Sequence, residues 1–233
     1  MIDFHSHVLP NVDDGSSSVE ESLAMLRALK QQGVNTVCAT PHFDATTETV
    51  EEFLKKRQSA YESLLPYLDD SCPRILLGAE VAYYEGISRL EDLTKLRLEG
   101  TRVLLLEMPF CRWSGYALTE LRELSCAGRI QLMLAHVERY RKFQKPGVFD
   151  KLLEYGIVMQ VNASYFLDWR TRRMALRMLD KGIVHVLGTD CHNMEHRPPR
   201  IGEAFDTISK RFGDGMISEM ERFGKYIIRK RRM

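Results

Sequence analysis

The first fourteen residues, MIDFHSHVLPNVDD, place two histidines and two adjacent carboxylates at the end of a short apolar run. His5 and His7 are separated by one residue, and Asp13 and Asp14 follow shortly after them. Imidazole nitrogens and carboxylate oxygens are the ligands with which proteins hold zinc, iron and manganese. The residue types and their spacing therefore indicate a functional site, for which metal binding is the chemistry to test.

Side chains of the same chemistry follow other apolar runs. A single histidine or glutamate in such a place is usually a hydrogen-bonded structural residue or a solvated loop charge. Here nearly every run ends in one, and clustering these charges without a cation would cost several kcal/mol for each unpaired buried ion. The pattern favours bound manganese, iron or zinc. The candidates are His42 in ATPHF, Glu80 in GAEV, Glu107 in LLLEMPF, His136 and Arg139 in LAHVERY, and Asp190, His192 and Arg197 in GTDCHNMEHR.

Short β-rich runs alternate with amphipathic helical patterns, and this alternation must position the candidates. Apolar strands separated by helices imply crossover connections and parallel pairing. Seven such units predict an α/β fold with a closed or nearly closed barrel, in which every strand ends at the same rim. The predicted strands are Ile2–His5, Thr36–Ala39, Ile75–Gly78, Val103–Leu106, Gln131–Ala135, Val158–Asn162 and His185–Gly188, and the helical patterns cover residues 19–33, 49–68, 116–128, 149–156, 169–182 and 201–213.

Composition limits the class of protein. The chain has 233 residues, 44% hydrophobic content and a formal net charge of +1, which argues against nucleic-acid binding by bulk charge. We expect one domain over residues 1–233, because no Gly/Ser-rich linker interrupts the pattern. Five cysteines without a CxxC pair favour a reducing compartment. With no signal peptide or membrane-spanning run, the sequence predicts a cytoplasmic protein.

Together these motifs resemble the PHP (polymerase and histidinol phosphatase) superfamily. The HSH pair, Asp14, TPH, the glutamate after the third strand, AH and DCH carry the resemblance from Met1 to about Arg200. The opening DFHSHVLPNVDDG, with HxER and DxH…R, is similar to bacterial protein-tyrosine phosphatases encoded with capsule and exopolysaccharide synthesis. The resemblance implies a distorted (β/α)7 TIM-like barrel of the PHP type and a metal-dependent phosphatase.

Two or three divalent metal ions, foremost Mn²⁺, are also implied by the resemblance. Asp13 is expected to be a solvated turn residue. The sequence departs from common relatives at HVER and at Cys191, but neither departure removes a ligand. The resemblance implies one metal at His5, His7, Glu80 and Asp190, a second at Glu80, Glu107 and His136, and a third at Asp14, His42 and His192.

Arg139 and Arg197 are the expected phosphate clamps, because guanidinium groups match phosphate oxygens in bidentate geometry. Asp190 or His192 could protonate the leaving group through water, and the sequence leaves that choice open. The segment from Cys191 to Arg197 also matches CX5R, the pattern of cysteine-dependent tyrosine phosphatases. That chemistry needs a loop of backbone N–H groups and an activated thiol, whereas HNMEH lacks glycine, so we interpret the match as coincidence.

The substrate implied by the resemblance is a phosphotyrosine protein, specifically a membrane-associated bacterial tyrosine kinase that would recruit the enzyme to the inner face of the membrane. Alternatives are a histidinol-phosphate phosphatase, a PHP-type exonuclease and an inactive metal-binding regulator.

Two other regions carry separate predictions. Tyr165 and Phe166 could line the mouth of the site or pack in the core. The nearby arginines are expected to be mostly solvated: Arg170, Arg172, Arg173 and Arg177. The basic end from Lys225, which includes Arg229, Lys230, Arg231 and Arg232, is expected to be a solvated tail.

Overall fold

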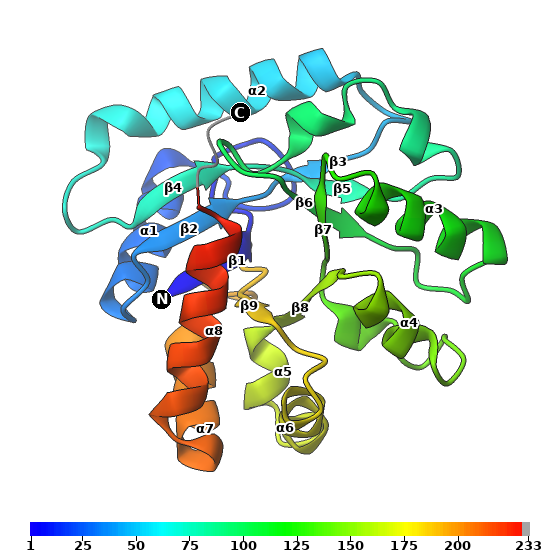
Figure 1. Cartoon of the computed structure of the whole chain (residues 1–233). Coiled ribbons are helices and arrows are strands. Elements are labelled where there is room, and N and C mark those ends of the chain that lie inside the picture. Colours follow the sequence, from blue (N-terminus) through cyan, green and yellow to red (C-terminus); the bar gives the residue numbers. More distant parts are fainter. Residues whose placement is uncertain (230–233) are drawn as a thin grey trace.

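A curled sheet of parallel strands lies at the centre of the computed structural model, which describes residues 1–229 (Figure 1). Each of the seven predicted strands is present, and the second and third are each divided into two segments. Pro41 divides the second, since proline has no N–H to donate to a ladder. The strands are β1 (Ile2–Ser6), β2 (Thr36–Ala39), β3 (His42–Phe43), β4 (Arg74–Leu77), β5 (Glu80–Ala82), β6 (Val103–Glu107), β7 (Gln131–Leu134), β8 (Val158–Asn162) and β9 (Val186–Gly188).

The strand order brings the two ends of the sheet together. One set of strands is ordered β1-β2-β4 and the other β3-β5-β6-β7-β8-β9, with β3 continuing β2 and β5 continuing β4. The N–H of Asp190, just past β9, donates to the carbonyl of His5 at 2.8 Å, and the N–H of His7 donates to the carbonyl of Cys191 at 2.9 Å. These bonds join the first and last strands, so the predicted distorted barrel is confirmed.

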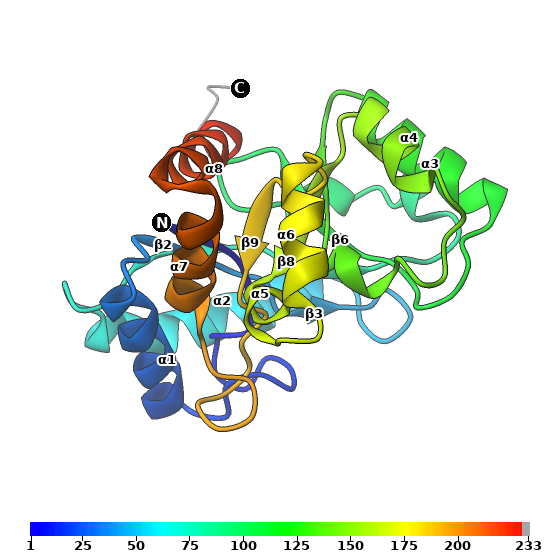
Figure 2. The same cartoon turned by 90° about the horizontal axis from the view of Figure 1, so that it is seen from below.

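Helices cover the outside of the sheet. In Figure 1, α2 crosses one side, α3 and α4 cover another, and α5 to α8 lie on a third. Figure 2 shows α7 and α8 together beside β9, with α3 and α4 on the opposite side. The helices are α1 (Val19–Gln31), α2 (Val50–Leu64), α3 (Gly115–Cys126), α4 (Val148–Glu154), α5 (Ala163–Leu167), α6 (Arg172–Asp180), α7 (Ile201–Phe212) and α8 (Asp214–Ile227), with 3₁₀ turns at η1 (Leu65–Tyr67), η2 (Ile87–Arg89), η3 (Leu93–Leu96) and η4 (Val137–Arg139).

Side-chain caps fix the starts of the first three helices. The Ser18 hydroxyl accepts a hydrogen bond from the N–H of Glu21 at the start of α1. At the start of α2, Thr49 and Glu52 form a reciprocal capping box. Such caps satisfy N–H groups that have no partner within the helix, and each typically contributes about 1 kcal/mol.

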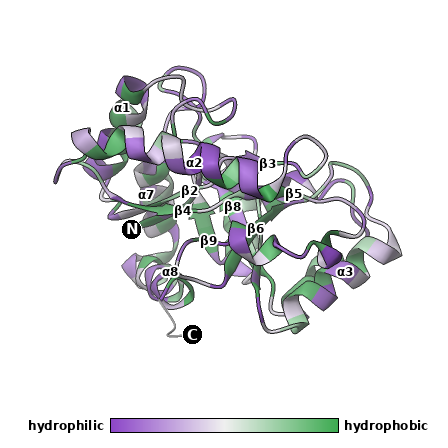
Figure 3. Ribbon diagram, turned by 90° about the horizontal axis from the view of Figure 1, so that it is seen from above, coloured by the Kyte–Doolittle hydropathy of each residue, from purple (hydrophilic) through white to green (hydrophobic). Residues whose placement is uncertain are grey.

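Alternate residues of each strand face two different apolar clusters. Leu104 and Leu106 of β6 belong to the cluster that the strands share with the helices, whereas Val103 and Leu105 belong to a smaller cluster made of strand residues. The strands at the centre of Figure 3 are accordingly mostly hydrophobic, while α2 and α3 mix both kinds of residue. Because side chains alternate between the two faces of a strand, every second residue of these strands faces the interior of the barrel.

Helix α8 was not predicted, and it packs against the smaller cluster through Phe223, Ile227 and Ile228. A Cβ at Gly224 would lie 3.0 Å from the Phe4 ring, so glycine lets α8 approach β1 closely. Lys225, predicted to begin the basic tail, is therefore helical and pairs with Glu221 at 3.4 Å. Arg229 is described just past the helix, whereas Lys230, Arg231 and Arg232 lie outside the described residues. Within residues 1–229, no helix is both long and apolar enough to cross a membrane.

Candidate metal centre

The predicted ligands lie together at the carboxyl ends of the strands. They come from segments as far apart in sequence as residues 5 and 192, and the parallel arrangement brings each to the same rim. This is the convergence that the sequence predicted. His5 lies in β1 and His7 just after it, Asp14 lies in the following loop, His42 and Glu80 begin β3 and β5, Glu107 ends β6, His136 follows β7, and Asp190 and His192 follow β9.

Glu80 is the central carboxylate. Its Oε2 lies 3.0 Å from His5 Nε2, 3.3 Å from His7 Nε2 and 3.1 Å from His42 Nδ1. Its other oxygen, Oε1, lies 2.9 Å from His136 Nε2. The side chain is only 1% exposed, so four imidazoles surround one buried carboxylate.

Three buried atoms of this cluster are left without a hydrogen bond. Within the described part of the chain, no hydrogen-bond partner is present for Glu80 Oε2, His136 Nδ1 or His192 Nε2, although other nitrogen or oxygen atoms lie close to Glu80 Oε2 and His192 Nε2. A buried polar atom without a partner normally costs about 1–3 kcal/mol. Burial alone would raise the pKa of Glu80, but the charge on His5 and the hydrogen bond with His136 hold it well below its ordinary value. An ionised, incompletely paired carboxylate among imidazoles fits a divalent cation.

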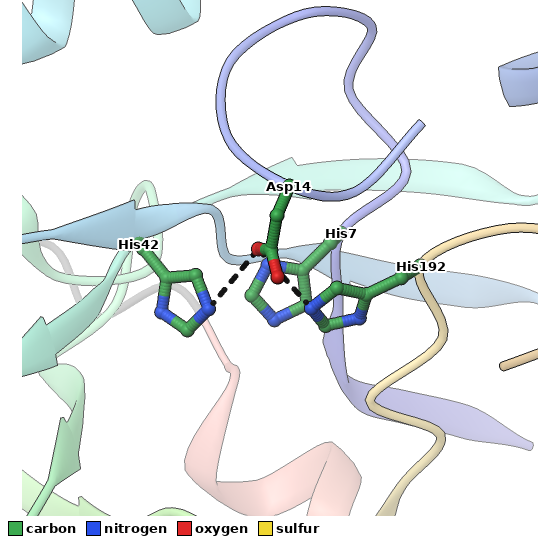
Figure 4. Close-up of side chains that lie close together, drawn as sticks. All are labelled: His7, Asp14, His42 and His192. Carbon is green, nitrogen blue, oxygen red and sulfur yellow. Dashed lines mark ion pairs between the residues drawn. The ribbon is translucent and has the colours of Figure 1, made fainter. Parts of the chain in front are cut away.

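A second group lies nearer the surface (Figure 4). The side chains of His7, Asp14, His42 and His192 come from four segments and point toward one another. Asp14 Oδ1 lies 3.5 Å from His42 Nε2 and 3.4 Å from His192 Nε2. One ligand atom from each of the four residues lies within 4.8 Å of the others. Asp14 is 69% exposed, so this group opens to solvent.

The remaining candidates form overlapping groups. His5, His7 and Asp190 offer ligand atoms within 4.8 Å of one another, and His42 does so with Glu80 and Glu107. His136 Nε2 lies 3.2 Å from Glu107 Oε1, as well as close to Glu80. His7 and His42 thus each lie between two groups. The division of the nine residues among three metals stays a prediction.

The interpretation of Asp13 as a solvated turn residue is wrong. Its side chain is only 7% exposed, and its Oδ2 lies 2.6 Å from His7 Nδ1. The same oxygen accepts a hydrogen bond from the N–H of His42 at 2.9 Å, and Oδ1 accepts one from Gly15. Burial opposes ionisation, but His7 and these donors lower the pKa of Asp13 well below its ordinary value. Asp13 therefore orients two candidate ligands, a role that imidazole ligands commonly require of a carboxylate.

The two predicted phosphate clamps converge on Asp190. Arg139 Nη2 donates to Asp190 Oδ2 at 2.5 Å, and Arg197 Nη2 lies 2.6 Å from Oδ1. Both arginines are more than a third exposed and border a pocket of about 530 Å³ beside the cluster. Each guanidinium has further N–H groups, so a phosphate in this pocket could accept from both.

Two of the candidate ligands have an unusual backbone conformation. His136 has φ of 29° and Asp190 has φ of 53°, in a region that residues other than glycine seldom adopt. Such conformations persist where the surrounding structure enforces them, and they are common at functional sites. Both residues directly follow a parallel strand, so the turn redirects their side chains toward the rim.

Sequence reasoning assigned no role to three buried polar residues that contact the candidate ligands. Asp3 in β1 accepts a hydrogen bond from the N–H of His5, and Gln160 and Asn162 come from β8, after which the segment from Asn162 to Trp169 was predicted only as a possible lining of the mouth. The available signal was their position: each stands in an apolar strand at the two-residue spacing that faces the barrel interior.

Cys191 does not have the environment of a nucleophilic cysteine. Its side chain is 1% exposed, and burial raises the pKa of the thiol well above its ordinary value. A reactive cysteine needs a lowered pKa and access to its substrate. The geometry therefore agrees with the interpretation of the CX5R match as coincidence.

Of the other residues singled out from the sequence, Phe166 packs in the core and Tyr165 is partly buried. The arginines of this region, Arg170, Arg172, Arg173 and Arg177, are exposed, as expected.

The chain matches known proteins over almost its whole length. Residues 1–223 match the family model described as capsular polysaccharide synthesis, CpsB/CapC. The tyrosine-protein phosphatase CpsB of Streptococcus pneumoniae is 32% identical, with 94% of each chain covered. The tyrosine-protein phosphatase YwqE of Bacillus subtilis is 30% identical, with 91% of this chain and 85% of the relative covered.

A solved structure supports the same relationship. A crystal structure from work on YwqE of Bacillus subtilis and CpsB of Streptococcus pneumoniae, described as unique metal-dependent tyrosine phosphatases, superposes with a TM-score of 0.85 and 26% identity. It covers 100% of this chain and 96% of that one. A phosphotriesterase homology protein of Escherichia coli shares the fold alone, with a TM-score of 0.58 and 12% identity. On the family match and the sequence relatives together, the chain belongs to the CpsB/CapC family of capsular polysaccharide synthesis.

Proposed function

We propose that this protein is a metal-dependent phosphatase that hydrolyses phosphotyrosine on a protein. The observation that carries the proposal is the environment of Glu80, a buried carboxylate in contact with four imidazoles and with one oxygen lacking a hydrogen bond. Membership in a family whose relatives are named tyrosine-protein phosphatases supports the choice of substrate.

The donor set of five imidazoles and four carboxylates suits two or three divalent ions, of which we propose Mn²⁺ before iron or zinc because nearly half of the ligands are carboxylates and none is a cysteine. Metal ions bound here would lower the pKa of water and make a nucleophile available near neutral pH. The proposed sets are His5, His7, Glu80 and Asp190 for one ion, Glu80, Glu107 and His136 for another, and Asp14, His42 and His192 for a third.

Arg139 and Arg197 would hold the non-bridging phosphate oxygens and stabilise the charge that develops on them. Burial, together with the charges of His7 and Arg197, lowers the pKa of His192 to about 4. The charges of His5 and Arg139 hold the pKa of Asp190 well below its ordinary value, although burial opposes this. In the metal-free protein these shifts favour the neutral imidazole of His192 and the ionised carboxylate of Asp190. Phenolate, with a pKa of about 10, is a leaving group that can depart without a strong acid and take its proton from water.

We further propose that the whole chain, residues 1–233, acts as one phosphatase domain in the cytoplasm, on a membrane-associated tyrosine kinase. The cysteines are all free thiols, which suits a reducing compartment. Two partly exposed arginines beside a pocket suit a phosphorylated side chain presented by a protein segment.

The test compares Glu80→Gln with Glu99→Gln, a substitution of an exposed glutamate. We expect the wild-type protein and Glu99→Gln to bind Mn²⁺ and to hydrolyse a phosphotyrosine peptide, with activity lost on chelation and restored by Mn²⁺. Glu80→Gln should lose metal and activity, measured by elemental analysis and phosphate release. Faster hydrolysis of histidinol phosphate than of the peptide would reassign the substrate, and chelator-resistant hydrolysis would overturn the mechanism.

A further inference from the structure

Strand β8 contributes two buried amides that reach three of the proposed metal ligands. We propose that Gln160 and Asn162 form a directional hydrogen-bond relay that positions His5, His136 and Asp190 for metal binding. This inference rests on the metal-dependent function proposed above, and both amides act through the ligands, so they are positioning residues.

A backbone donor fixes the direction of the relay. The N–H of His136 donates to Gln160 Oε1 at 2.7 Å, and since a backbone N–H can only donate, the amide oxygen must face it. His5 Nδ1 lies 3.2 Å from the same oxygen and must therefore carry its proton there. In the neutral ring that binds a metal, His5 Nε2 is then the unprotonated nitrogen, and it faces Glu80 Oε2 at 3.0 Å. Fixing the tautomer leaves one nitrogen of His5 free to bind a metal.

The second half of the relay selects one oxygen of Asp190. Because its oxygen is already occupied, Gln160 presents Nε2, which donates to Asn162 Oδ1 at 2.9 Å. Asn162 Nδ2 in turn donates to Asp190 Oδ2 at 2.8 Å. Asp190 Oδ1, which Arg197 also contacts, faces His5 and His7 at 3.7 and 3.5 Å from their Nε2 atoms. The relay therefore acts together with Arg139, which donates to the same Oδ2, to hold Oδ1 toward the cluster.

The surroundings pack closely against the two amides. Gln160 is fully buried and Asn162 nearly so, and a buried donor or acceptor that loses its partner is costly. A Cβ at Gly188 would lie 2.8 Å from Gln160 Nε2 and 2.5 Å from His5 Cβ. Glycine at this position provides the space in which both side chains fit.

Gln160→Leu removes the three relay bonds made by Gln160, to His5, His136 and Asn162, and the test measures Mn²⁺ affinity from the free Mn²⁺ signal in electron paramagnetic resonance. We expect about a 10–100-fold loss of affinity in the folded variant, the usual effect of removing a residue that orients a metal ligand. Gln160→Glu keeps the acceptor for His5 and His136 but loses the donor to Asn162, so its affinity should lie between those of Gln160→Leu and the wild type. Gln131→Leu is the matched control, since it removes a single hydrogen bond to the Gly156 carbonyl at the other end of the sheet. Its affinity should equal that of the wild type.

A double-mutant cycle tests whether the two amides act as one chain. Asn162→Ala alone should weaken Mn²⁺ binding, but it should have a smaller effect once Gln160→Leu has already broken the relay. Additive losses would overturn the relay, and so would wild-type affinity in folded Gln160→Leu. If Gln160→Leu does not fold, wild-type affinity in Asn162→Ala overturns the proposal. Failure of the wild-type protein to bind Mn²⁺ would instead overturn the function on which the relay rests.

Discussion

Replacing the buried Asp3 by asparagine should stabilise the protein at neutral pH. Asp3 is fully buried in β1, where it accepts hydrogen bonds from Thr189 N–H at 2.8 Å and from the Thr189 hydroxyl at 2.6 Å. Burial raises the pKa of Asp3 from 3.8 to about 6, because these bonds and the neighbouring His5 offset the loss of solvation only in part. At pH 7 the protein therefore folds around a carboxylate whose ionised form is disfavoured.

The size of the effect follows from linkage between proton binding and folding. Between pH 3.8 and about 6 the folded protein holds a proton on Asp3 that the unfolded chain has released, so stability falls as pH rises through this window. One pKa unit is worth about 1.4 kcal/mol, so the ionised Asp3 costs about 3 kcal/mol above pH 6. Asparagine removes this cost and keeps the contacts: its oxygen can accept from Thr189 N–H, its amide can donate to Thr189 Oγ1, and that hydroxyl can turn to the His5 carbonyl at 3.3 Å.

Urea unfolding of the metal-free protein from pH 4 to pH 8 measures this effect directly. The free energy of unfolding of Asp3→Asn minus that of the wild type should rise from near zero below pH 4 to about 3 kcal/mol above pH 6. Asp70→Asn, at an exposed position, is the control and should show no such rise. A difference that stays flat, or that falls as pH rises, would refute the reasoning.

Three further predictions concern activity and metal binding. Cys191→Ser should keep most of the Mn²⁺-dependent phosphatase activity, because the thiol is buried with a raised pKa; loss of activity in a folded, metal-loaded variant would contradict this. Asp13→Ala should weaken Mn²⁺ binding about 10–100-fold by releasing His7, measured by Mn²⁺ titration, and Asp13→Asn should restore it only in part because an amide has one acceptor oxygen. Deleting residues 230–233 should leave hydrolysis of a small aryl phosphate unchanged, since the candidate site ends at Arg197; a loss in folded, fully metallated protein would place the tail in the site.

The sequence predicted the strands and the convergence of candidate ligands because both depend on local patterns. A parallel barrel brings every strand end to one rim, so a histidine or carboxylate just past an apolar run is placed without knowledge of distant contacts. Glu80, His136 and Asp190 were found in this way. Helix α8 was not predicted, although its apolar residues pack against the strands. Its sequence follows α7 without a break and ends in a basic segment, which was interpreted as a solvated tail.

Asp13 and Gln160 could not be assigned from local pattern. Asp13 stands in a loop with turn-forming neighbours, and only the approach of His7 and His42 makes it a buried acceptor. Gln160 depends on the His136 backbone, which lies on a neighbouring strand end. In both cases the function of the side chain comes from a partner that the fold brings close, whereas the ligands themselves are marked by their own chemistry.

The joint between β1 and β9 has a consequence for how the protein is made. His5 and His7 are synthesised more than 180 residues before Asp190 and His192, which follow the strand that completes their surroundings. Contacts between such distant segments form late, because a long loop must close before they are gained. Synthesis also runs from the N-terminus at about 5–20 residues per second, so the two histidines wait for their partners for roughly ten seconds or more. The complete set of candidate ligands can therefore come together only after β9 has been synthesised and has joined β1.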